Sequence, residues 1–494
     1  MKLMTKNASA TRARALAPSA TADTAALASV LPALAIALAL ALALALAPAP
    51  AAKAQDSNDA LINLLMQKGV LSTQDAQNVR AELKQQKQQQ AATAAAPAAG
   101  KTSTESKLKL FPGLTELNFF GDMRLRYEYL NATKNADPND HLEMNRARYR
   151  LRLGFTGKFV DGWFFGARLE TANSDRSTNV TMGSYGGSPF GKNAGNTIYV
   201  GQAYAGWTNG DFTFTAGRLA NPFTYGQTFI WSDDVNPEGL AEQWKHNFGA
   251  FSLFANLGQF AYNNNGGATN TWGNAAGIHG TYMLGQQIGG NLKFDGGRMY
   301  VQVAPAYYTY SNDGSHDGLV ALKPPTATGN TTAGYQTAGL QVLDLPVDLG
   351  LPAIAGAVPV KIFGDFANNF GSHARAEAAG YKETGGNDKA WQLGAAFGQP
   401  KSKGDWELRA FYQSIDAFAL DPNIINTTEL DAHTNMKGFT VMGTYVIING
   451  VSVKLSYFNG QRKDAALPTY GYGNFNTTDL GKYSVLRADL LLKF

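Results

Sequence analysis

The sequence predicts an all-β membrane protein, a sixteen-stranded antiparallel transmembrane β-barrel preceded by a short α-helical segment. Three observations predict it. Apolar and polar residues alternate in the final strand, long loops alternate with short turns, and a chain rich in Gly, Phe and Tyr lacks long apolar runs. Helical membrane spans need about 20 consecutive apolar residues, whereas barrel strands need only alternation. Weak strand signals near 275–295 and 334–356 leave 14 or 18 strands open.

The last thirteen residues, KYSVLRADLLLKF, alternate between an apolar and a mostly charged side. A period of two is typical of a strand, because successive side chains point to opposite faces. A chain that ends on such a strand with an aromatic resembles the closing strand of a bacterial outer-membrane barrel, which the assembly machinery reads. The candidate assembly signal is Phe494, Leu492 and Leu490. The alternative is an edge strand of a soluble sandwich.

From residue 117 onward, strand-like segments are separated by two kinds of connection. The long ones are rich in Asn, Gly, Asp, Ser and Pro and fall near 131–142, 174–196, 220–238, 260–276, 311–333, 370–387, 416–434 and 462–481. The short ones fall near 160–162, 208–211, 246–249, 295–297, 399–403 and 448–450, with a less clear break around 346–356. Long loops on one side and tight turns on the other are typical of outer-membrane barrels. Closure satisfies every backbone group in lipid, and sixteen strands enclose an aqueous lumen.

The domain organisation follows from composition. Residues 1–54 have a basic start, an Ala/Leu run and an A-x-A site at 52–54, which together predict a cleaved secretory signal, with an N-terminal membrane anchor as the alternative. Residues 55–90 have helical spacing and predict a periplasmic helical hairpin or coiled coil, with a partly ordered tail as the alternative. Residues 91–116 form a low-complexity linker, and 117–494 form the barrel. The expected location is the bacterial outer membrane, with the helical segment in the periplasm.

Charge and cysteine content exclude several classes of protein. The signal segment holds five of the 42 basic residues and one of the 38 acidic residues, so the remainder holds 37 of each. A neutral mature chain does not predict a nucleic-acid partner. The absence of Cys removes disulfides and thiolate metal sites. We expect no cofactor and no metal.

Several segments resemble the family of proteobacterial putative porins. They are ALINLLMQKGVLSTQDAQNVRAEL with its Gln-rich spacer, the barrel opening with DMRLRYEY and RARYRLRLGF, and GRLANPF followed by FIWSDDVNPEGLA. The resemblance implies a passive outer-membrane channel for small hydrophilic solutes or ions, with no defined substrate. It also implies contact with outer-membrane lipid, lipopolysaccharide and the barrel assembly machinery. Porins of this size usually form homotrimers through outward faces near the first and last strands.

One face of three successive strands is rich in arginine, and these side chains are the predicted pore-lining and selectivity residues. They are Arg124, Arg126, Arg146, Arg148, Arg150, Arg152 and Arg168. Neighbouring strands lie about 4.8 Å apart, so the residues form a basic wall that favours anions. The alternative is that Asp122, Glu128, Glu143 and Glu170 neutralise the wall in ladders that only stiffen the barrel.

The third long connection is the predicted constriction loop. It carries Asp233, Asp234, Glu238 and Trp231, and its aromatic residues suit packing against the inner wall. An acidic loop facing a basic wall sets up a transverse field. A surface loop with scattered aromatics is the alternative.

The sequence gives little support for an enzymatic function. The six histidines show no H-E-x-x-H spacing, and no local motif pairs a nucleophile with a positioned base. We therefore expect no enzyme and no catalytic residues. A surface adhesin built on a barrel is the principal alternative function, and a barrel hydrolase is a weaker one.

Overall fold

The computed structural model describes 113–172, 177–183, 197–224, 229–263, 281–311, 337–354, 358–381, 387–426, 429–471, 473–475 and 477–494, together with Phe111. The predicted signal segment 1–54 and helical segment 55–90 lie outside the described residues, as does most of the linker 91–116.

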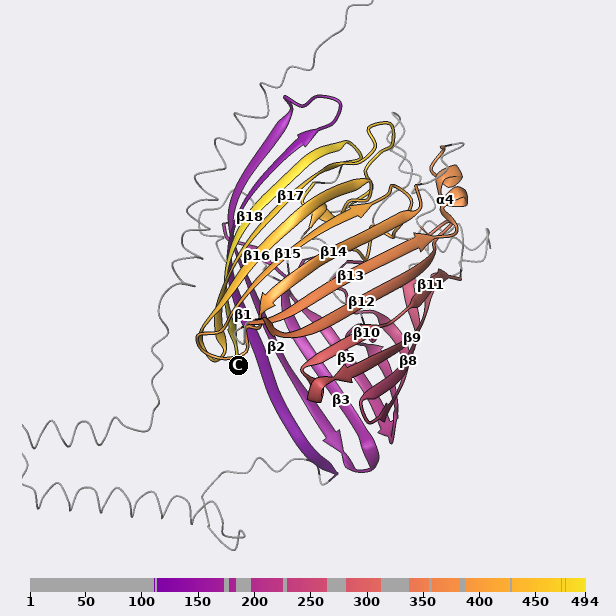
Figure 1. Cartoon of the computed structure of the whole chain (residues 1–494), viewed down its shortest axis with the longest axis vertical. Helices are drawn as coiled ribbons and strands as arrows, with labels where there is room; N and C mark the ends of the chain where they lie inside the picture. Colours follow the sequence, from indigo (N-terminus) through magenta and orange to yellow (C-terminus); the bar gives the residue numbers. More distant parts are fainter. Residues whose placement is uncertain are drawn as a thin grey trace, which may run out of the picture. The chain divides into compact units, whose positions relative to one another are not determined.

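The described chain is built almost entirely from antiparallel strands (Figure 1). In chain order they are β1 (Leu114–Lys134), β2 (His141–Phe159), β3 (Trp163–Ala172), β4 (Val180–Thr181), β5 (Thr197–Asn209), β6 (Phe212–Arg218), β7 (Glu238–Phe248), β8 (Phe251–Asn263), β9 (Thr281–Phe294), β10 (Met299–Val303), β11 (Ala306–Tyr310), β12 (Gln341–Ile354), β13 (Val358–Asn369), β14 (Lys389–Gly398), β15 (Trp406–Ile415), β16 (Met436–Ile448), β17 (Val451–Arg462) and β18 (Leu480–Lys493). The described helix α4 (Ser372–Ala378) follows β13.

These segments form a closed barrel of sixteen strands, which confirms the predicted fold class. The two-residue β4 pairs only with β2, and β10 and β11 are halves of one strand interrupted at Ala304 and Pro305. Proline lacks the N–H that a ladder requires, so an interruption there is expected. The ring closes where β1 pairs with β18, from Asp122 opposite Lys493 to Lys134 opposite Leu480.

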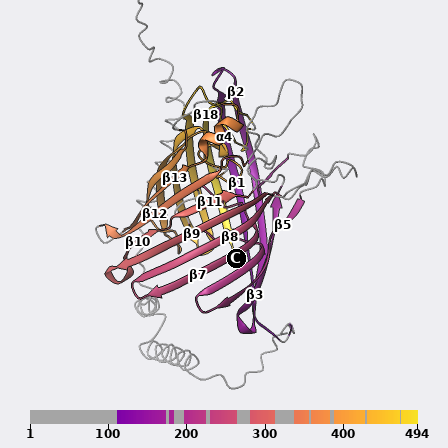
Figure 2. The same cartoon turned by 90° about the vertical axis from the view of Figure 1, so that its right-hand side faces the viewer.

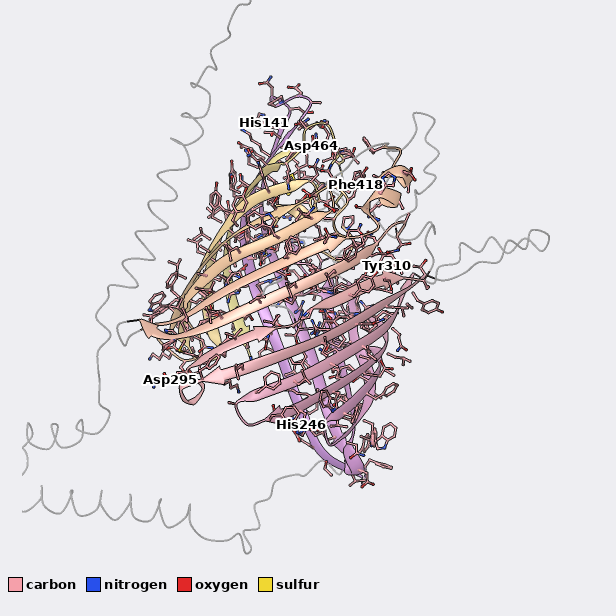
Figure 3. The ribbon with its side chains drawn as sticks, turned by 45° about the vertical axis from the view of Figure 1, so that its right-hand side comes forward. His141, His246, Asp295, Tyr310, Phe418 and Asp464 are labelled. Carbon is pink, nitrogen blue, oxygen red and sulfur yellow. The ribbon has the colours of Figure 1, made fainter. Side chains whose placement is uncertain are left out.

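Short turns lie at one end of the barrel and long connections at the other. Figure 3 shows His246 and Asp295 toward the short-turn end, and His141 and Asp464 toward the opposite end. The less clear break expected around 346–356 is displaced, because β12 runs to Ile354 and pairs with β13 through that region. The first long connection is also shorter than expected, because β1 extends to Lys134 and β2 begins at His141.

Alternation separates an outer apolar face from an inner face along each strand. On β12 the outward Leu343 and Leu345 are each 38% exposed, whereas Val342 and Asp344 are buried. Exposed aromatics such as Trp163 and Phe248 gather at the short-turn end, where the Trp207 indole donates to the Asp161 carbonyl at 3.0 Å. An apolar band edged by aromatics is the surface that a bilayer requires.

The main buried cluster lies inside the barrel rather than within its wall. It joins inward residues such as Phe363 and Phe411 to loop residues such as Trp231, Leu420 and Ile425. A second cluster joins Ala376 of α4 to neighbouring loops. Long connections therefore fold onto the inner wall and onto each other. Among the described residues, no helix is both long enough and apolar enough to cross a membrane.

Candidate functional site

The basic wall, defined as the seven predicted arginines, occupies the inner face of β1, β2 and β3. The β1–β2 register sets Arg124 opposite Arg150 and Arg126 opposite Arg148. Because directly opposed side chains on one face lie about 5 Å apart, such pairs repel unless acids intervene. The acids are supplied by the same three strands and by β18.

Glu128 is the most heavily engaged of these acids. It is fully buried and pairs with Arg146, with Arg148 at 3.3 Å and with Arg487 at 2.9 Å. Arg487 belongs to β18, directly opposite Glu128 in the register. One carboxylate therefore ties the first two strands to the last, and an acid so placed stabilises three neighbouring cations at once.

Three further acids complete the wall. Asp122 accepts a hydrogen bond from Arg150 at 2.5 Å, and Asp489 binds Arg126 at 2.6 Å. Glu170 lies 2.9 Å from Arg152 and 3.3 Å from Arg168. Arg124 has a different kind of partner, because its guanidinium donates to the side-chain oxygen of Asn179 at 2.5 Å. Strand side chains alone thus leave arginines in excess over acids.

One of the expected neutralising acids lies elsewhere, and two charged residues of β18 join the wall. Glu143 lies on the outward face of β2, where it is exposed and contacts Asn131, so it does not neutralise the wall. Asp489 and Arg487 take part instead. The alternation of the last strand already placed both opposite its apolar side, but their contact with β1 depends on barrel closure.

The described parts of the loop between β6 and β7, residues 219–224 and 229–237, fold inward and are anchored by aromatic packing. Trp231 is 2% exposed and its ring centroid lies 6.0 Å from that of Phe223 and 5.9 Å from that of Tyr308. Tyr308 belongs to the inner face of β11. Phe223 and Trp231 therefore pack against the inner wall of the barrel.

This loop brings Asp234 to the basic wall. The carboxylate lies 2.5 Å from Arg152 and 4.0 Å from Arg150, and it accepts a hydrogen bond from Thr178 at 3.3 Å. Burial alone raises the pKa of Asp234, but the charges of Arg152, Arg124 and Arg150 outweigh it and lower the pKa overall. Asp234 is therefore a fixed negative charge at neutral pH.

The other acids of the predicted constriction loop are placed differently. Asp233 is exposed. Glu238 is the first residue of β7 and pairs with Arg218 of β6, with 57% of its side chain exposed. The alternation of both strands directs this pair to the outer face, so Glu238 does not lie with Asp234. The sequence grouped them by proximity in the chain, but the return of the chain to the barrel wall separates them.

A second inward loop lies between β15 and β16, with residues 416–426 and 429–435 described, and it was not predicted to join the site. It meets the first where the Ser232 amide donates to the Ile424 carbonyl at 2.8 Å. Leu430, Asp431 and Ala432 all have positive φ, a conformation that non-glycine residues rarely hold. The buried Asp431 carboxylate accepts from the Asn474 and Phe475 amides at 2.6 and 2.8 Å, which fixes this turn.

Glu429 precedes that turn and is 5% exposed. Burial raises the pKa of Glu429 to about 7, although the positive charges of Lys454 and Arg487 oppose the rise. Glu429 is therefore a titratable acid near the β17–β18 side of the basic wall. No local sequence signal distinguishes it from other loop acids, because its position depends on the fold of the loop.

Two more loop segments contact the wall. Arg148 donates to Ser177 at 3.1 Å and to the Asn179 carbonyl at 3.0 Å, and Arg146 donates to the side chain of Asn474. Asn474 also donates to Asp431 at 2.7 Å. The wall is thus contacted by loops from several parts of the chain, and Asp234 is their strongest ionic contact with it.

The candidate assembly residues lie at the short-turn end. The Phe494 carbonyl accepts a hydrogen bond from Gly121 at 2.8 Å, and its ring is 66% exposed. Leu492 and Leu490 lie opposite Met123 and Leu125 of β1. Within the described part of the chain, no three His, Asp or Glu side chains converge as a metal ion would require.

A closed sixteen-stranded barrel with an apolar outer band and a charged inner wall defines an outer-membrane β-barrel of the porin type. The sequence profile of the family described as "Putative porin" matches residues 105–350. The chain belongs to this family, on a match that spans about half its length, and the resemblance noted in the sequence is confirmed. Family and fold together place the protein in the outer membrane.

Solved structures similar to this chain include engineered variants of the porin from Rhodopseudomonas blastica. One variant is 11% identical, with 77% of this chain and 100% of that chain covered and a TM-score of 0.39. A triple variant is also 11% identical with the same coverage and a TM-score of 0.37. A structure described as "Asymmetric conductivity of engineered proteins" is 10% identical, with the same coverage and a TM-score of 0.39. A search of curated proteins found no match to the chain.

Proposed function

We propose that this protein is a passive diffusion channel for small hydrophilic solutes, with a preference for anions. The observation that carries the proposal is the contact between Asp234 of the inward loop and Arg152 and Arg150 of the basic wall. A loop that crosses the lumen to reach a charged wall narrows the path and lines it with fixed charge. Rings or walls of arginine favour anions by replacing lost hydration.

The electrostatic balance at the wall supports the anion preference. The seven arginines and Arg487 meet Asp122, Glu128, Glu170, Asp489 and Asp234. Positive charge therefore remains in excess at this face of the lumen. The mature chain is neutral, so the preference depends on where the charges lie rather than on their sum.

The remaining organisation is part of the same proposal. Residues 1–54 act as a cleaved export signal, residues 55–90 form a helical segment in the periplasm, and Phe494, Leu492 and Leu490 are read by the barrel assembly machinery. The chain assembles as a homotrimer in contact with lipid and lipopolysaccharide. No enzymatic role is proposed.

Planar-bilayer recording of the purified full-length protein tests the proposal. We expect discrete, ohmic conductance steps, and in a salt gradient a reversal potential of the sign that marks anion preference. Steps with a cation-selective reversal potential would contradict the role of the basic wall but not channel activity. Silence where a control porin conducts would contradict channel activity and favour the adhesin alternative, for which cell binding by loop-deleted variants is the assay.

A further inference from the structure

The outer face of β6 to β9 differs from the other outward faces of the barrel. Figure 2 shows β7, β8 and β9 side by side on the side of the barrel that faces the viewer. Apart from His246 near the short turns, the outward residues on these strands include Arg218, Glu238, Glu242, Gln259 and Gln286, which are polar or charged. We call this set the outer polar patch. By contrast, β14 is apolar along its outward face at Trp391, Leu393, Ala395 and Phe397, and its outward charge, Lys389, stands at the long-loop end of the strand.

The position of Glu242 along β7 shows that the outer polar patch lies within the apolar band. The neighbouring Gln243 donates to the Pro222 carbonyl of the inward loop at 3.2 Å, so alternation directs Glu242 outward. Glu242 lies opposite Phe214 on β6 and Leu257 on β8. It is six residues from Phe248 at the short-turn end, which places it roughly 16 Å above that end of an apolar band about 25 Å tall.

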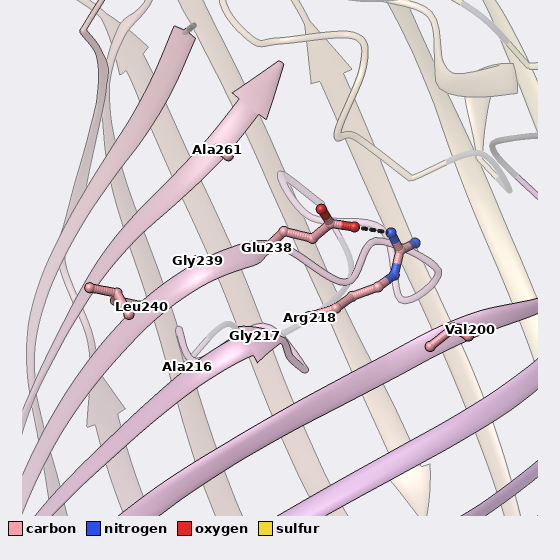
Figure 4. A pocket seen from close by; sticks show the side chains of 8 residues that line it. All are labelled: Val200, Ala216, Gly217, Arg218, Glu238, Gly239, Leu240 and Ala261. Carbon is pink, nitrogen blue, oxygen red and sulfur yellow. Dashed lines mark hydrogen bonds and ion pairs between the residues drawn. The ribbon is translucent and has the colours of Figure 1, made fainter. Parts of the chain in front are cut away.

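Arg218 and Glu238 form an ion pair at one end of the patch, whereas its middle is only weakly hydrogen-bonded. Gln259 lies 3.4 Å from Glu242, a long contact for a hydrogen bond, and both Gln259 and Gln286 are exposed. The Arg218–Glu238 pair, shown in Figure 4, is 40% and 57% exposed. Charged and amide groups on a lipid face are destabilising, and the effect is largest near the middle of the bilayer.

Two shallow, open hollows flank these polar groups on the same face. The first, of about 580 Å³, lies where the small residues Ala216, Gly217, Gly239 and Ala261 surround Leu240 (Figure 4). The second, of about 440 Å³, is lined by Leu257, Gln259 and Gln286 among others. Close by, Ile288 is 58% exposed and Leu257 is 43% exposed. The patch therefore combines hollows with protruding apolar side chains.

We propose that the outer face of β6 to β9 is an interface with a second copy of this chain. The patch lies within the bilayer, so the partner must itself be embedded in the membrane. It carries both charge signs, amides that both donate and accept, and both hollows and protrusions. Such a surface can be complementary to its own copy, as a symmetric oligomer requires. The face near β1 and β18, where the sequence placed the trimer contact, is apolar at Leu486, Ala488 and Leu490 and suits lipid.

Native mass measurement of the full-length protein in mild detergent tests the interface. The Ala216→Trp substitution fills the first hollow, and Ala395→Trp adds the same bulk on the outward face of β14 as a matched control. We expect an oligomer for the wild type and for Ala395→Trp, and at least a tenfold loss of oligomer for Ala216→Trp. A wild-type monomer, with or without bound lipopolysaccharide, would overturn the proposal, as would equal masses for both variants.

Cross-linking in native outer membranes provides a second readout that does not depend on detergent. The natural chain has no Cys, so single substitutions give unambiguous attachment sites. With a flexible bismaleimide, Leu240→Cys should give a dimer-sized band, and Leu393→Cys on β14 should not. Equal cross-linking at both positions would overturn the proposal. Conductance of the same samples keeps this outcome distinct from the proposed channel activity, because a conducting monomer contradicts the interface and the proposed homotrimer but not the channel.

Discussion

The inner face of β1 to β3 and the outer face of β6 to β9 both carry charged residues, but the two regions differ in what meets those charges. Inside, Glu128 is fully buried and bound to arginines from two strands. Outside, Glu242 has one long contact with Gln259. Charges paired within the chain organise the barrel and its lumen, whereas weakly paired charges on a lipid face point to a partner beyond the chain.

The largest expected effect comes from breaking the inner region at its centre. Glu128→Ala leaves Arg146, Arg148 and Arg487 clustered without their shared acid, and we expect a loss of about 3–5 kcal/mol in the free energy of unfolding. Glu116→Ala is the matched control, because its pair with Lys158 is exposed to solvent and contributes little to stability. Denaturant unfolding in detergent, followed by tryptophan fluorescence, measures both. Equal losses would show that the inner network is not special.

The next effect concerns selectivity along the same wall. Replacing Arg146, Arg148 and Arg150 with Gln should move the reversal potential away from anion preference. We expect about a twofold change in permeability ratio per charge, since the Coulomb energy at ~10 Å in water is about 0.4 kcal/mol.

Lys401 and Lys403, in the turn between β14 and β15, are the controls for that change. Their replacement should leave selectivity unchanged, and the arginine effect should shrink at 1 M salt, where the Debye length falls to about 3 Å. Wild-type selectivity combined with easier unfolding would mean that the arginines form structural ladders only.

A smaller and opposite effect is expected from the loop acid. Asp234→Asn removes a fixed negative charge beside Arg152 and should raise anion preference by about twofold by the same Coulomb estimate. Glu238→Gln is a matched control that sharpens the comparison between regions, because Glu238 lies on the outer face of the barrel. Salt-gradient reversal potentials of the two variants measure the difference. A shift of equal size in both would show that Glu238 also reaches the lumen.

The smallest expected effect is a pH dependence carried by Glu429. Because its pKa is raised to about 7, the carboxyl is mostly neutral at pH 6 and mostly charged at pH 8. Anion preference should therefore be higher at pH 6, and Glu429→Gln should abolish the difference. The pKa of Glu429 in the folded protein lies above its ordinary value of 4.5. Ionisation of this group therefore lowers the free energy of unfolding as the pH rises from 4.5 to about 7. An unchanged pH response in the variant would assign the titration to another group.

Sequence alternation was sufficient to identify most residues of the basic wall, because inward and outward positions differ by a single step along a strand. It also predicted the eight long connections and most of the short turns. Applied strictly, alternation also puts Glu143 on the outward face, three residues from the inward Arg146, so its grouping with the wall acids was wrong. Alternation was insufficient for Glu238, which follows Asp234 closely in the chain but returns to the outer face. Proximity in the chain does not report which face a residue occupies after a turn.

By itself the sequence determined the class of fold and the inner and outer faces, since these follow from local periodicity and from turn-forming residues. It favoured sixteen strands but left 14 or 18 open, and the closed ring of the structure decided the count. Only the tertiary structure decided which charges meet. The pair of Arg126 with Asp489 joins residues that are 363 positions apart, and it exists only because β1 and β18 close the ring. The approach of Asp234 and Glu429 to the wall depends on how two long loops pack inside the barrel, where burial and contacts between distant segments, rather than local propensity, fix the backbone.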